Sequence, residues 1–250
     1  MAMNTGYIVG FAGAICLVCS LGVGAASQLL KPQIQANELN AFQKKLLAAV
    51  EIPTVDEAGQ VLPPEQVEAL FKERLKLVVV DSEGNEALAD KTDDEKLAAV
   101  ADARAKVKGT PDSPALSPVY LRKDGETTAA YAIELQGKGL WGPISGYLAL
   151  KPDGREVMSV AFDAPKETPG LGAEIMKDKF KDQWKTKSIA KGANLVPIAV
   201  EKSCAGKDAA HCVDGVSGAT ITSNGVDEMV ERAVTTEYKN YLSKINKAGG

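Results

Sequence analysis

An uncharged stretch near the N-terminus is the strongest constraint on this 250-residue chain. Residues 7–30 contain no charged side chain, and the apolar run within them is long enough to cross a bilayer as a helix. A cleaved signal peptide is the alternative interpretation, because residues 24–26 are small, but no Lys or Arg precedes Tyr7. We therefore expect a retained membrane anchor over residues 1–30, with its transmembrane helix at residues 7–27.

The charges around this stretch do not fix its orientation. Lys31, Lys44 and Lys45 follow it, whereas only the terminal amine precedes it, and this bias taken alone favours a cytoplasmic position for the rest of the chain. Cys16 and Cys19 lie three residues apart on one face of the expected helix. Small apolar packing residues are the simplest interpretation of this pair, and a redox or metal role is the minor alternative.

The rest of the chain predicts a mixture of helices and strands. Pro32 marks a bend between the anchor and a second helix that lifts the domain off the membrane. Strands at residues 144–150 and 156–162 form a hairpin at the centre of an antiparallel sheet. The other expected elements are strands at residues 77–80, 131–136 and 196–200 and helices at residues 64–75, 93–107 (solvated) and 174–184. The fold class is therefore α+β: an N-terminal transmembrane helix and one soluble domain whose antiparallel sheet is covered by helices.

Composition excludes several classes of protein. With 45% hydrophobic residues the chain can bury one sizeable core, and 29 basic against 33 acidic residues give no reason to expect a nucleic-acid partner. Four cysteines in two unlike pairs exclude a dense disulfide framework. Cys204, His211 and Cys212 lack a fourth ligand and Cys-x-x-Cys spacing, so a metal site is not expected. A disulfide between Cys204 and Cys212 is the better hypothesis if the compartment is oxidising.

The stretch from Asp214 to Gly225 is the best candidate for a functional site. Its glycines allow close approach of the backbone to a ligand, and its serines and threonines offer hydroxyls to a polar group. A helix is expected from about Asn224, whose free N–H groups would face an anion, although Asp227 and Glu228 would compete for that end. An anion there would need more than dipole attraction, such as a covalent bond. A plain turn leading into a surface helix is the simpler alternative.

Two familiar motifs are present only in part: one lacks its structural context and the other lacks a residue. Residues 137–142 have the letters G-x-G-x-x-G, but Pro143 and a strand follow where a dinucleotide-binding fold needs a helix. Residues 215–219 nearly spell the hydrolase elbow G-x-S-x-G, but Ala219 replaces the second glycine and His211 is the single histidine available as a base. Neither a nicotinamide site nor a serine hydrolase is therefore expected.

Three motifs together resemble one known family. Ser217-Gly218-Ala219-Thr220, preceded by Asp214, resembles the flavinylation motif of FMN-binding domains, in which the last threonine carries FMN through a phosphoester bond. Turns at residues 139–142 and 167–172 precede it in the order and rough spacing of the C subunits of bacterial Na⁺-translocating NADH:quinone oxidoreductases. The resemblance covers essentially the whole chain, is strongest over residues 137–234 and is weak over residues 31–130.

The resemblance implies a site and a cofactor. FMN would be attached to Thr220, no residue would be catalytic, and no metal would be bound. The other residues implied at the FMN site are Ser217, Gly218 and Ala219 of the motif, Glu167, Thr168, Leu171 and Gly172 lining the isoalloxazine, and Leu140 and Trp141 near it. The implied partners are the other membrane subunits of the complex and, for maturation, a flavin transferase.

The resemblance also implies an organisation and a location. Residues 1–30 would be the anchor, residues 31–130 a stalk helix and the N-terminal part of the soluble domain, and residues 131–250 the FMN-binding domain. The chain would cross the bacterial inner membrane once and place its domain in the periplasm, which overrides the charge flanks. It would relay single electrons in a Na⁺-pumping NADH:quinone oxidoreductase. The alternatives are the homologous G subunit of the ferredoxin:NAD oxidoreductase complex and a non-redox, membrane-anchored assembly module.

Overall fold

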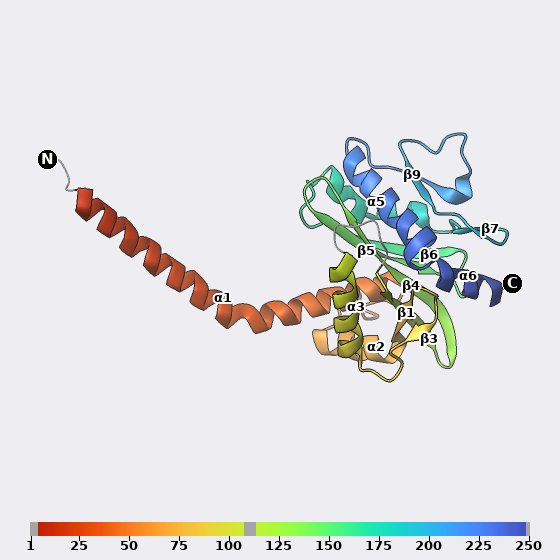
Figure 1. Ribbon diagram of the computed structural model, residues 1–250, viewed down its shortest axis with the longest axis horizontal. Helices are drawn as coiled ribbons and strands as arrows, with labels where there is room; N and C mark the ends of the chain where they lie inside the picture. The colour runs from red at the N-terminus through yellow and green to blue at the C-terminus, as the bar shows by residue number, and fades with distance from the viewer. Residues whose placement is uncertain (1–4, 108–113, 249–250) are drawn as a thin grey trace. The chain divides into compact units, whose positions relative to one another are not determined.

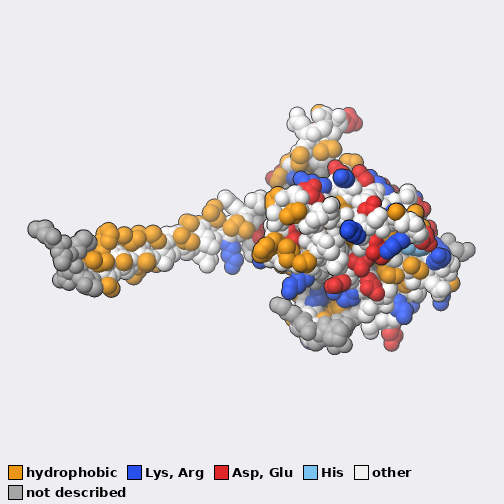
Figure 2. All heavy atoms as spheres, turned by 90° about the horizontal axis from the view of Figure 1, so that it is seen from above, with side chains coloured by type: hydrophobic (Ala, Val, Ile, Leu, Met, Phe, Trp, Pro, Cys, Tyr) orange, Lys and Arg blue, Asp and Glu red, His pale blue; other side chains and the backbone are white. Residues whose placement is uncertain are grey.

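The protein is described from a computed structural model, which covers residues 5–107 and 114–248 and divides into two compact units, Met1–Gln43 and Lys44–Gly250. The first unit is a single long helix, α1 (Thr5–Ala49), whose last turns belong to the second unit. In the described residues, α1 is the one helix long and apolar enough to cross a membrane, with a mean hydropathy of 2.2 in its most apolar window. Figure 2 shows hydrophobic side chains along its N-terminal part.

Pro32 lies inside α1, so the anchor and the expected second helix are one continuous helix. A proline in a helix removes one backbone hydrogen bond and bends the axis without necessarily ending the helix. Figure 1 shows the axis of α1 changing direction partway along its length. At about 1.5 Å per residue, α1 exceeds the roughly 20 residues that a bilayer requires, so helix remains beyond the span.

The second unit is built on a six-stranded antiparallel sheet with the order β2-β1-β3-β4-β5-β6 (Figure 1). Its strands are β1 (Leu75–Asp81), β2 (Glu86–Ala87), β3 (Leu116–Asp124), β4 (Thr127–Lys138), β5 (Pro143–Leu150) and β6 (Val157–Asp163). The expected hairpin of β5 and β6 is present, but β6 is an edge strand, so its predicted central position is wrong. The centre is taken by β3 and β4, because the unpredicted strand β3 pairs with both β1 and β4.

Helices cover this sheet from sequence positions far apart. The helices α2 (Pro64–Arg74) and α3 (Asp93–Val107) pack against β1 and β3, whereas α5 (Thr220–Arg232) packs against β4 and β9. The helix α3 was expected to be solvated, but one side of it is covered, because Val100 and Ala103 are buried. After α5 the chain continues as a π-helical turn (Ala233–Glu237) and α6 (Lys239–Ala248), which were not predicted.

The segment expected as one helix at residues 174–184 is three short pieces. They are η1 (Gly172–Met176), α4 (Asp178–Lys181) and η2 (Asp182–Trp184). Lys177, in an extended conformation with ψ 152°, separates η1 from α4, whereas η2 follows α4 directly. Phe180 and Trp184 of this segment are nevertheless buried, and they pack with each other and with Phe162 of β6, with ring centroids 5.5–6.1 Å apart. This aromatic cluster holds the segment that follows the 167–172 turn against the sheet.

A small parallel pair of strands leads into the candidate site. The strand β9 (Ala199–Glu201) is shorter than the strand expected at residues 196–200 and pairs with β10 (Cys212–Asp214), which was not predicted. A second small pair, β7 (Ala190–Lys191) with β8 (Asn194–Leu195), lies between the aromatic segment and β9 in the sequence. Because β10 ends at Asp214, the flavinylation-like motif begins at the last residue of a paired strand.

Candidate functional site

The helix after the motif begins earlier than the sequence predicts. α5 starts at Thr220 rather than near Asn224, and Ala219 occupies the N-cap position. The reason is Gly218, whose φ of 79° turns the chain into the first helical turn, and the amide of Ser223 already donates to the carbonyl of Ala219 at 2.9 Å. The N–H groups of Thr220, Ile221 and Thr222 precede this bond, so they point from the helix end towards any anion held there.

The acidic residues of α5 do not compete for this end, contrary to expectation. Asp227 lies in the second turn, and its Oδ1 accepts a hydrogen bond from the backbone N–H of Val200 at 2.7 Å. This bond joins α5 to β9. Glu228 is exposed and contributes to a different cavity, so neither carboxylate occupies the N-terminal end of the helix.

One cavity of about 340 Å³ brings the three sequence motifs together. Its lining residues are Leu140, Trp141, Glu167, Thr168, Leu171, Gly172, Gly218, Ala219, Thr220, Ile221 and Thr222. All of the expected site residues are therefore present except Ser217, which is exposed and not part of the lining. The sequence interpretation missed Ile221 and Thr222 as site residues. Their signal was their position in the first turn of α5, which a helix start at Asn224 obscured.

Glu167 joins the two turns to the first turn of α5 through its buried carboxylate. Its Oε1 accepts a hydrogen bond from the backbone N–H of Trp141 at 2.8 Å, and its Oε2 accepts one from the hydroxyl of Thr222 at 2.6 Å. Glu167 is 6% exposed and Thr222 is 1% exposed. We call these three residues and their bonds the Glu167 network. It connects the 139–142 turn, the 167–172 turn and the first turn of α5.

Two glycines make room for this network. A Cβ on Gly172 would lie 2.6 Å from Oγ1 of Thr222 and even closer to the carboxylate of Glu167. A Cβ on Gly139 would lie 2.6 Å from Oε1 of Glu167. Because real Cβ atoms do not approach so closely, these positions require glycine for packing reasons, whatever their backbone angles.

The carboxyl of Glu167 is held in its ionised form. Burial by itself raises the pKa of Glu167, but the hydrogen bond from Thr222 and those from the backbone of residues 140–142 together lower it below its usual value. A carboxylate that accepts several hydrogen bonds prefers the charged state. The wall of the cavity therefore contains a negative charge.

The rim of the cavity is apolar and exposed. Trp141 is 65% exposed, Ile221 55%, Leu140 49% and Leu171 43%. Large hydrophobic side chains gathered around one cavity on a protein surface are typical of a place where a ligand or partner covers them. The arrangement offers apolar contacts to a flat ring and helix N–H groups to an attached phosphate, so the residues present fit FMN.

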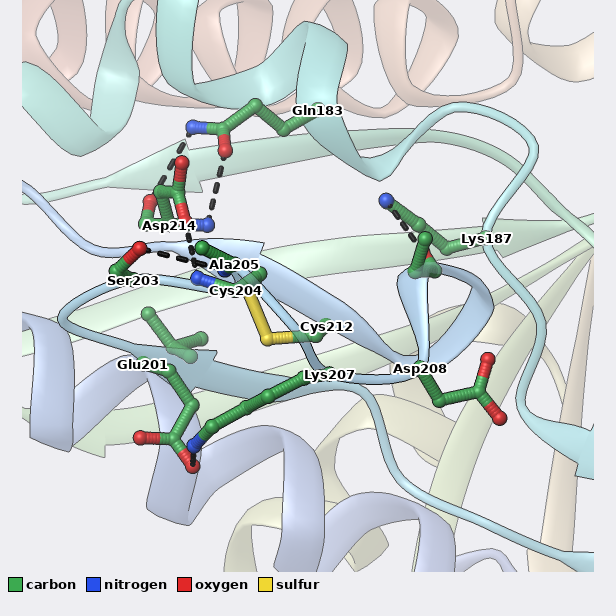
Figure 3. The surroundings of a disulfide bond; sticks show 12 residues. Gln183, Lys187, Glu201, Ser203, Cys204, Ala205, Lys207, Asp208, Cys212 and Asp214 are labelled. Carbon is green, nitrogen blue, oxygen red and sulfur yellow. Dashed lines mark hydrogen bonds and ion pairs between the residues drawn. A yellow bond between two sulfur atoms is a disulfide. The ribbon is translucent and has the colours of Figure 1, made fainter.

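The strand before the motif is held by a disulfide between Cys204 and Cys212, which confirms the pairing expected from the sequence (Figure 3). Cys204 in turn donates its backbone N–H to Oδ1 of Asp214 at 2.6 Å. The side chain of Gln183 bonds both the N–H and the carbonyl of Asp214, as Figure 3 shows. The first residue of the flavinylation-like motif is therefore fixed from both sides.

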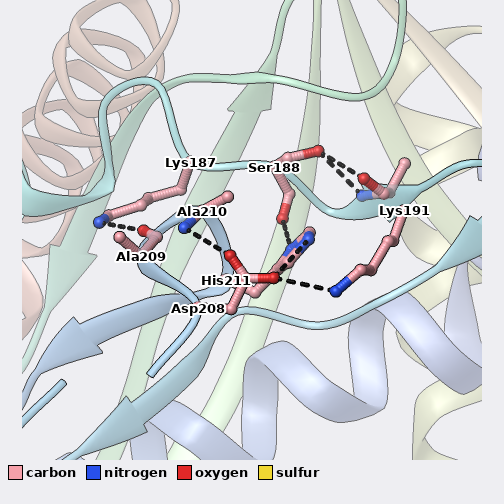
Figure 4. Close-up of polar contacts among 8 residues, drawn as sticks. Lys187, Ser188, Lys191, Asp208, Ala209, Ala210 and His211 are labelled. Atoms are coloured by element: carbon pink, nitrogen blue, oxygen red, sulfur yellow. Dashed lines mark hydrogen bonds and ion pairs between the residues drawn. The ribbon is translucent and has the colours of Figure 1, made fainter. Parts of the chain in front are cut away.

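His211 takes part in loop structure. Its Nδ1 lies 2.7 Å from the carbonyl oxygen of Ser188, and its Nε2 lies 4.0 Å from the carboxylate of Asp208, which also pairs with Lys191 (Figure 4). In residues 5–107 and 114–248, no group of three or more His, Cys, Asp or Glu side chains could hold a metal ion. Strand β5 rather than a helix follows the G-x-G-x-x-G letters, so the dinucleotide interpretation also fails.

Comparisons with known proteins show which family the chain resembles. The family model described as FMN-binding domain matches residues 139–235. The C subunit of the Na⁺-translocating NADH-quinone reductase from Vibrio alginolyticus is 32% identical over 243 residues, covering 90% of each chain. The corresponding C subunit from Haemophilus ducreyi is 31% identical and covers 94% of this chain and 92% of its own.

Solved structures share the fold. The crystal structure of the C subunit from Parabacteroides distasonis matches with a TM-score of 0.67 at 30% identity, over 85% of this chain and 96% of that one. A crystal structure of Shewanella oneidensis NqrC matches with a TM-score of 0.66 at 22% identity. Because the similarity to the curated relatives runs through nearly the whole of both chains, this protein belongs to the family of the C subunits of Na⁺-translocating NADH-quinone reductases.

Proposed function

We propose that this protein is the membrane-anchored subunit that carries FMN and transfers electrons within a Na⁺-translocating NADH:quinone reductase. Its membership of the C-subunit family and the FMN-binding domain at residues 139–235 support this function. The observation that carries it is the cavity in which three motifs distant in sequence meet at the N-terminal end of α5. A tethered FMN supplies one-electron chemistry there, so the subunit relays electrons between the carriers of its partner subunits and has no catalytic residue or metal of its own.

Thr220 is the residue to which FMN is attached through a phosphoester bond. Among the hydroxyls of the loop, Thr222 is buried and bonded to Glu167, and Ser223 is buried and accepts the N–H of Val216 at 3.0 Å. Ser217 is exposed but lies outside the lining of the cavity. Thr220 alone of the four is both exposed and part of the lining. A flavin transferase can therefore reach it, and the phosphate would face the free N–H groups of α5.

The remaining lining residues hold and shield the flavin ring. Leu140 and Trp141 on one turn and Leu171 on another offer apolar contacts, and Ile221 adds one from α5. Thr168 offers a hydroxyl, and Gly172, Gly218 and Ala219 let the backbone come close. Enclosure by these groups keeps water from part of the ring and fixes its position relative to the next carrier.

The domain after the anchor lies in the periplasm, and the chain crosses the bacterial inner membrane once. The Cys204–Cys212 disulfide supports this orientation, because disulfides persist in oxidising compartments such as the periplasm and are rare in the cytosol. Cys16 and Cys19 are free and exposed on α1, in keeping with small residues of a transmembrane face. The functional division is an anchor at residues 1–30, a stalk and N-terminal part at residues 31–130, and an FMN-binding part at residues 131–250. The last two parts fold together, because β3 pairs with β4.

The attachment is tested by Thr220→Ala in full-length chain coexpressed with a flavin transferase. We expect wild-type protein to give a fluorescent flavin band in a denaturing gel and Thr220→Ala to give none, while both reach the membrane in equal amounts. Ser217→Ala is the matched control and should stay fluorescent. Fluorescence that survives in Thr220→Ala moves the attachment to another hydroxyl. A wild-type chain without any flavin favours a non-redox assembly module instead.

A further inference from the structure

We propose that Glu167 is a positioning residue whose buried carboxylate joins the 139–142 turn to the first turn of α5 and places a fixed negative charge in the wall of the cavity, where it lowers the reduction potential of the flavin. This inference rests on the proposed function, because it concerns FMN held in that cavity. It assigns to Glu167 an effect on the reduction potential of the flavin, in addition to contact with the isoalloxazine ring.

The joining role follows from three separate segments meeting on one side chain. Glu167 itself belongs to the 167–172 turn, Trp141 to the turn between β4 and β5, and Thr222 to α5. The hydrogen bonds to Trp141 and Thr222 use both carboxylate oxygens, at 2.8 and 2.6 Å. Glu167 lies 26 residues from Trp141 and 55 from Thr222 in the sequence. This one carboxylate therefore holds together segments that are far apart along the chain.

The charge of Glu167 is not neutralised by a neighbouring cation in the described part of the cavity. The residues that line it include no Lys or Arg. Lys166, the preceding residue, packs its stem beside Gly142 and is exposed, so water screens its charge. The partners of the carboxylate are neutral hydroxyl and amide donors, which stabilise the charge but do not remove it.

A fixed negative charge beside a redox group disfavours reduction. Adding an electron to the flavin adds negative charge to the cavity, and the repulsion between like charges is screened less at a buried site than in water. The carboxylate of Glu167 therefore makes reduction less favourable and donation of the electron to the next carrier more favourable. The N–H groups of α5 act in the opposite direction at the phosphate. Glu167 thus offsets the positive end of the helix on the ring side of the site.

The experiment is a redox titration of purified full-length protein carrying covalent FMN, at pH 8 so that the carboxylate stays ionised. We expect Glu167→Gln, which keeps the size of the side chain and removes its charge, to shift the midpoint potential of the flavin in the positive direction. Glu228→Gln removes a carboxylate from an exposed position of α5 that does not line the cavity, and it should leave the potential unchanged. An unchanged potential in Glu167→Gln, or an equal shift in Glu228→Gln, overturns the proposal.

A second variant separates the charge from the structural role of the network. Thr222→Val removes the hydroxyl that partners the carboxylate but leaves the charge, so the potential should stay the same or become more negative. A positive shift in Thr222→Val matching that of Glu167→Gln would mean that disturbance of the loops moves the potential, and the inference would fail. If Glu167→Gln does not accumulate with flavin, Thr222→Val is judged against wild type alone: a more negative potential supports the inference, and any positive shift overturns it. The failure differs from failure of the proposed function, in which wild-type protein would carry no FMN at all.

Discussion

Gly172 has no room for a side chain, because the side chains of Glu167 and Thr222 lie where its Cβ would be. Its missing Cβ leaves the space that the carboxylate of Glu167 and the hydroxyl of Thr222 share. We expect Gly172→Ala to separate these two groups, to lower the stability of the domain by about 1–3 kcal/mol, as overpacking does, and to reduce flavin attachment. Thermal unfolding and in-gel flavin fluorescence measure the two effects.

Gly142→Ala is the matched control for this substitution. A Cβ on Gly142 would meet only the stem of Lys166, which is exposed and can move aside. Its melting temperature should stay near that of wild type. Equal losses of stability in both variants would show that neither turn tolerates alanine, and the space shared by Glu167 and Thr222 would not be the cause.

Glu167 should also make the stability of the domain depend on pH. Its pKa in the folded state is below the usual value, because its hydrogen bonds outweigh the effect of burial. A lowered folded pKa stabilises the fold at pH values above the unfolded pKa, about 4.3, and this contribution disappears as the pH falls through the folded value. We expect the free energy of unfolding to fall more steeply below about pH 5 in wild type than in Glu167→Gln. Urea unfolding at a series of pH values measures this, and parallel curves would contradict it.

At the scale of elements, the disulfide holds the loop that leads into β10. Cutting it frees a short loop and, in a chain-entropy estimate, costs about 2–3 kcal/mol. We expect Cys204→Ser with Cys212→Ser to lower the melting temperature, and a thiol reductant to lower that of wild type but not of the variant. Cys16→Ser with Cys19→Ser makes the same chemical change at free cysteines of α1 and should have no effect. A reductant that leaves wild type unchanged would show that the disulfide does not stabilise the fold.

The elements differ in how well the sequence predicts them. Strands β4, β5 and β6 were found because their apolar runs are bounded by turn residues such as Asp153 and Gly154. Strand β3 was missed because Pro118 and a charged C-terminal end are unusual in a central strand. Its place is explained by tertiary contacts: the carbonyl of Pro118 accepts a hydrogen bond at 3.0 Å from the hydroxyl of Tyr238, which lies 120 residues away between the π-helical turn and α6.

The candidate site was predicted as a set of residues but not as a geometry. Motifs identified Thr220, Glu167 and Trp141, and the structure brings them to one cavity. The start of α5 could not be predicted, because it depends on the positive φ of Gly218 rather than on a capping side chain. The Glu167 network could not be predicted either, since its hydrogen bonds join segments whose spatial proximity is decided by the sheet.

For the whole molecule, the proposed topology makes a direct prediction. If the domain is periplasmic, a protease added to intact spheroplasts should remove it and leave only the membrane-spanning part of α1 protected. The result is read by immunoblotting with a tag at the C-terminus, and a cytoplasmic protein serves as the control for intact cells. Cleavage of the domain only after lysis would place it in the cytoplasm.

The exposure of Thr220 at the start of α5 has a consequence for biosynthesis. The N–H groups that would face the phosphate converge only after this helix has formed and packed on β4. A translocated but unfolded chain presents the motif residues to a transferase without the converging N–H groups of α5. On the proposed function, the native domain is thus the better acceptor of FMN, and flavin fluorescence reports which molecules have already passed through folding.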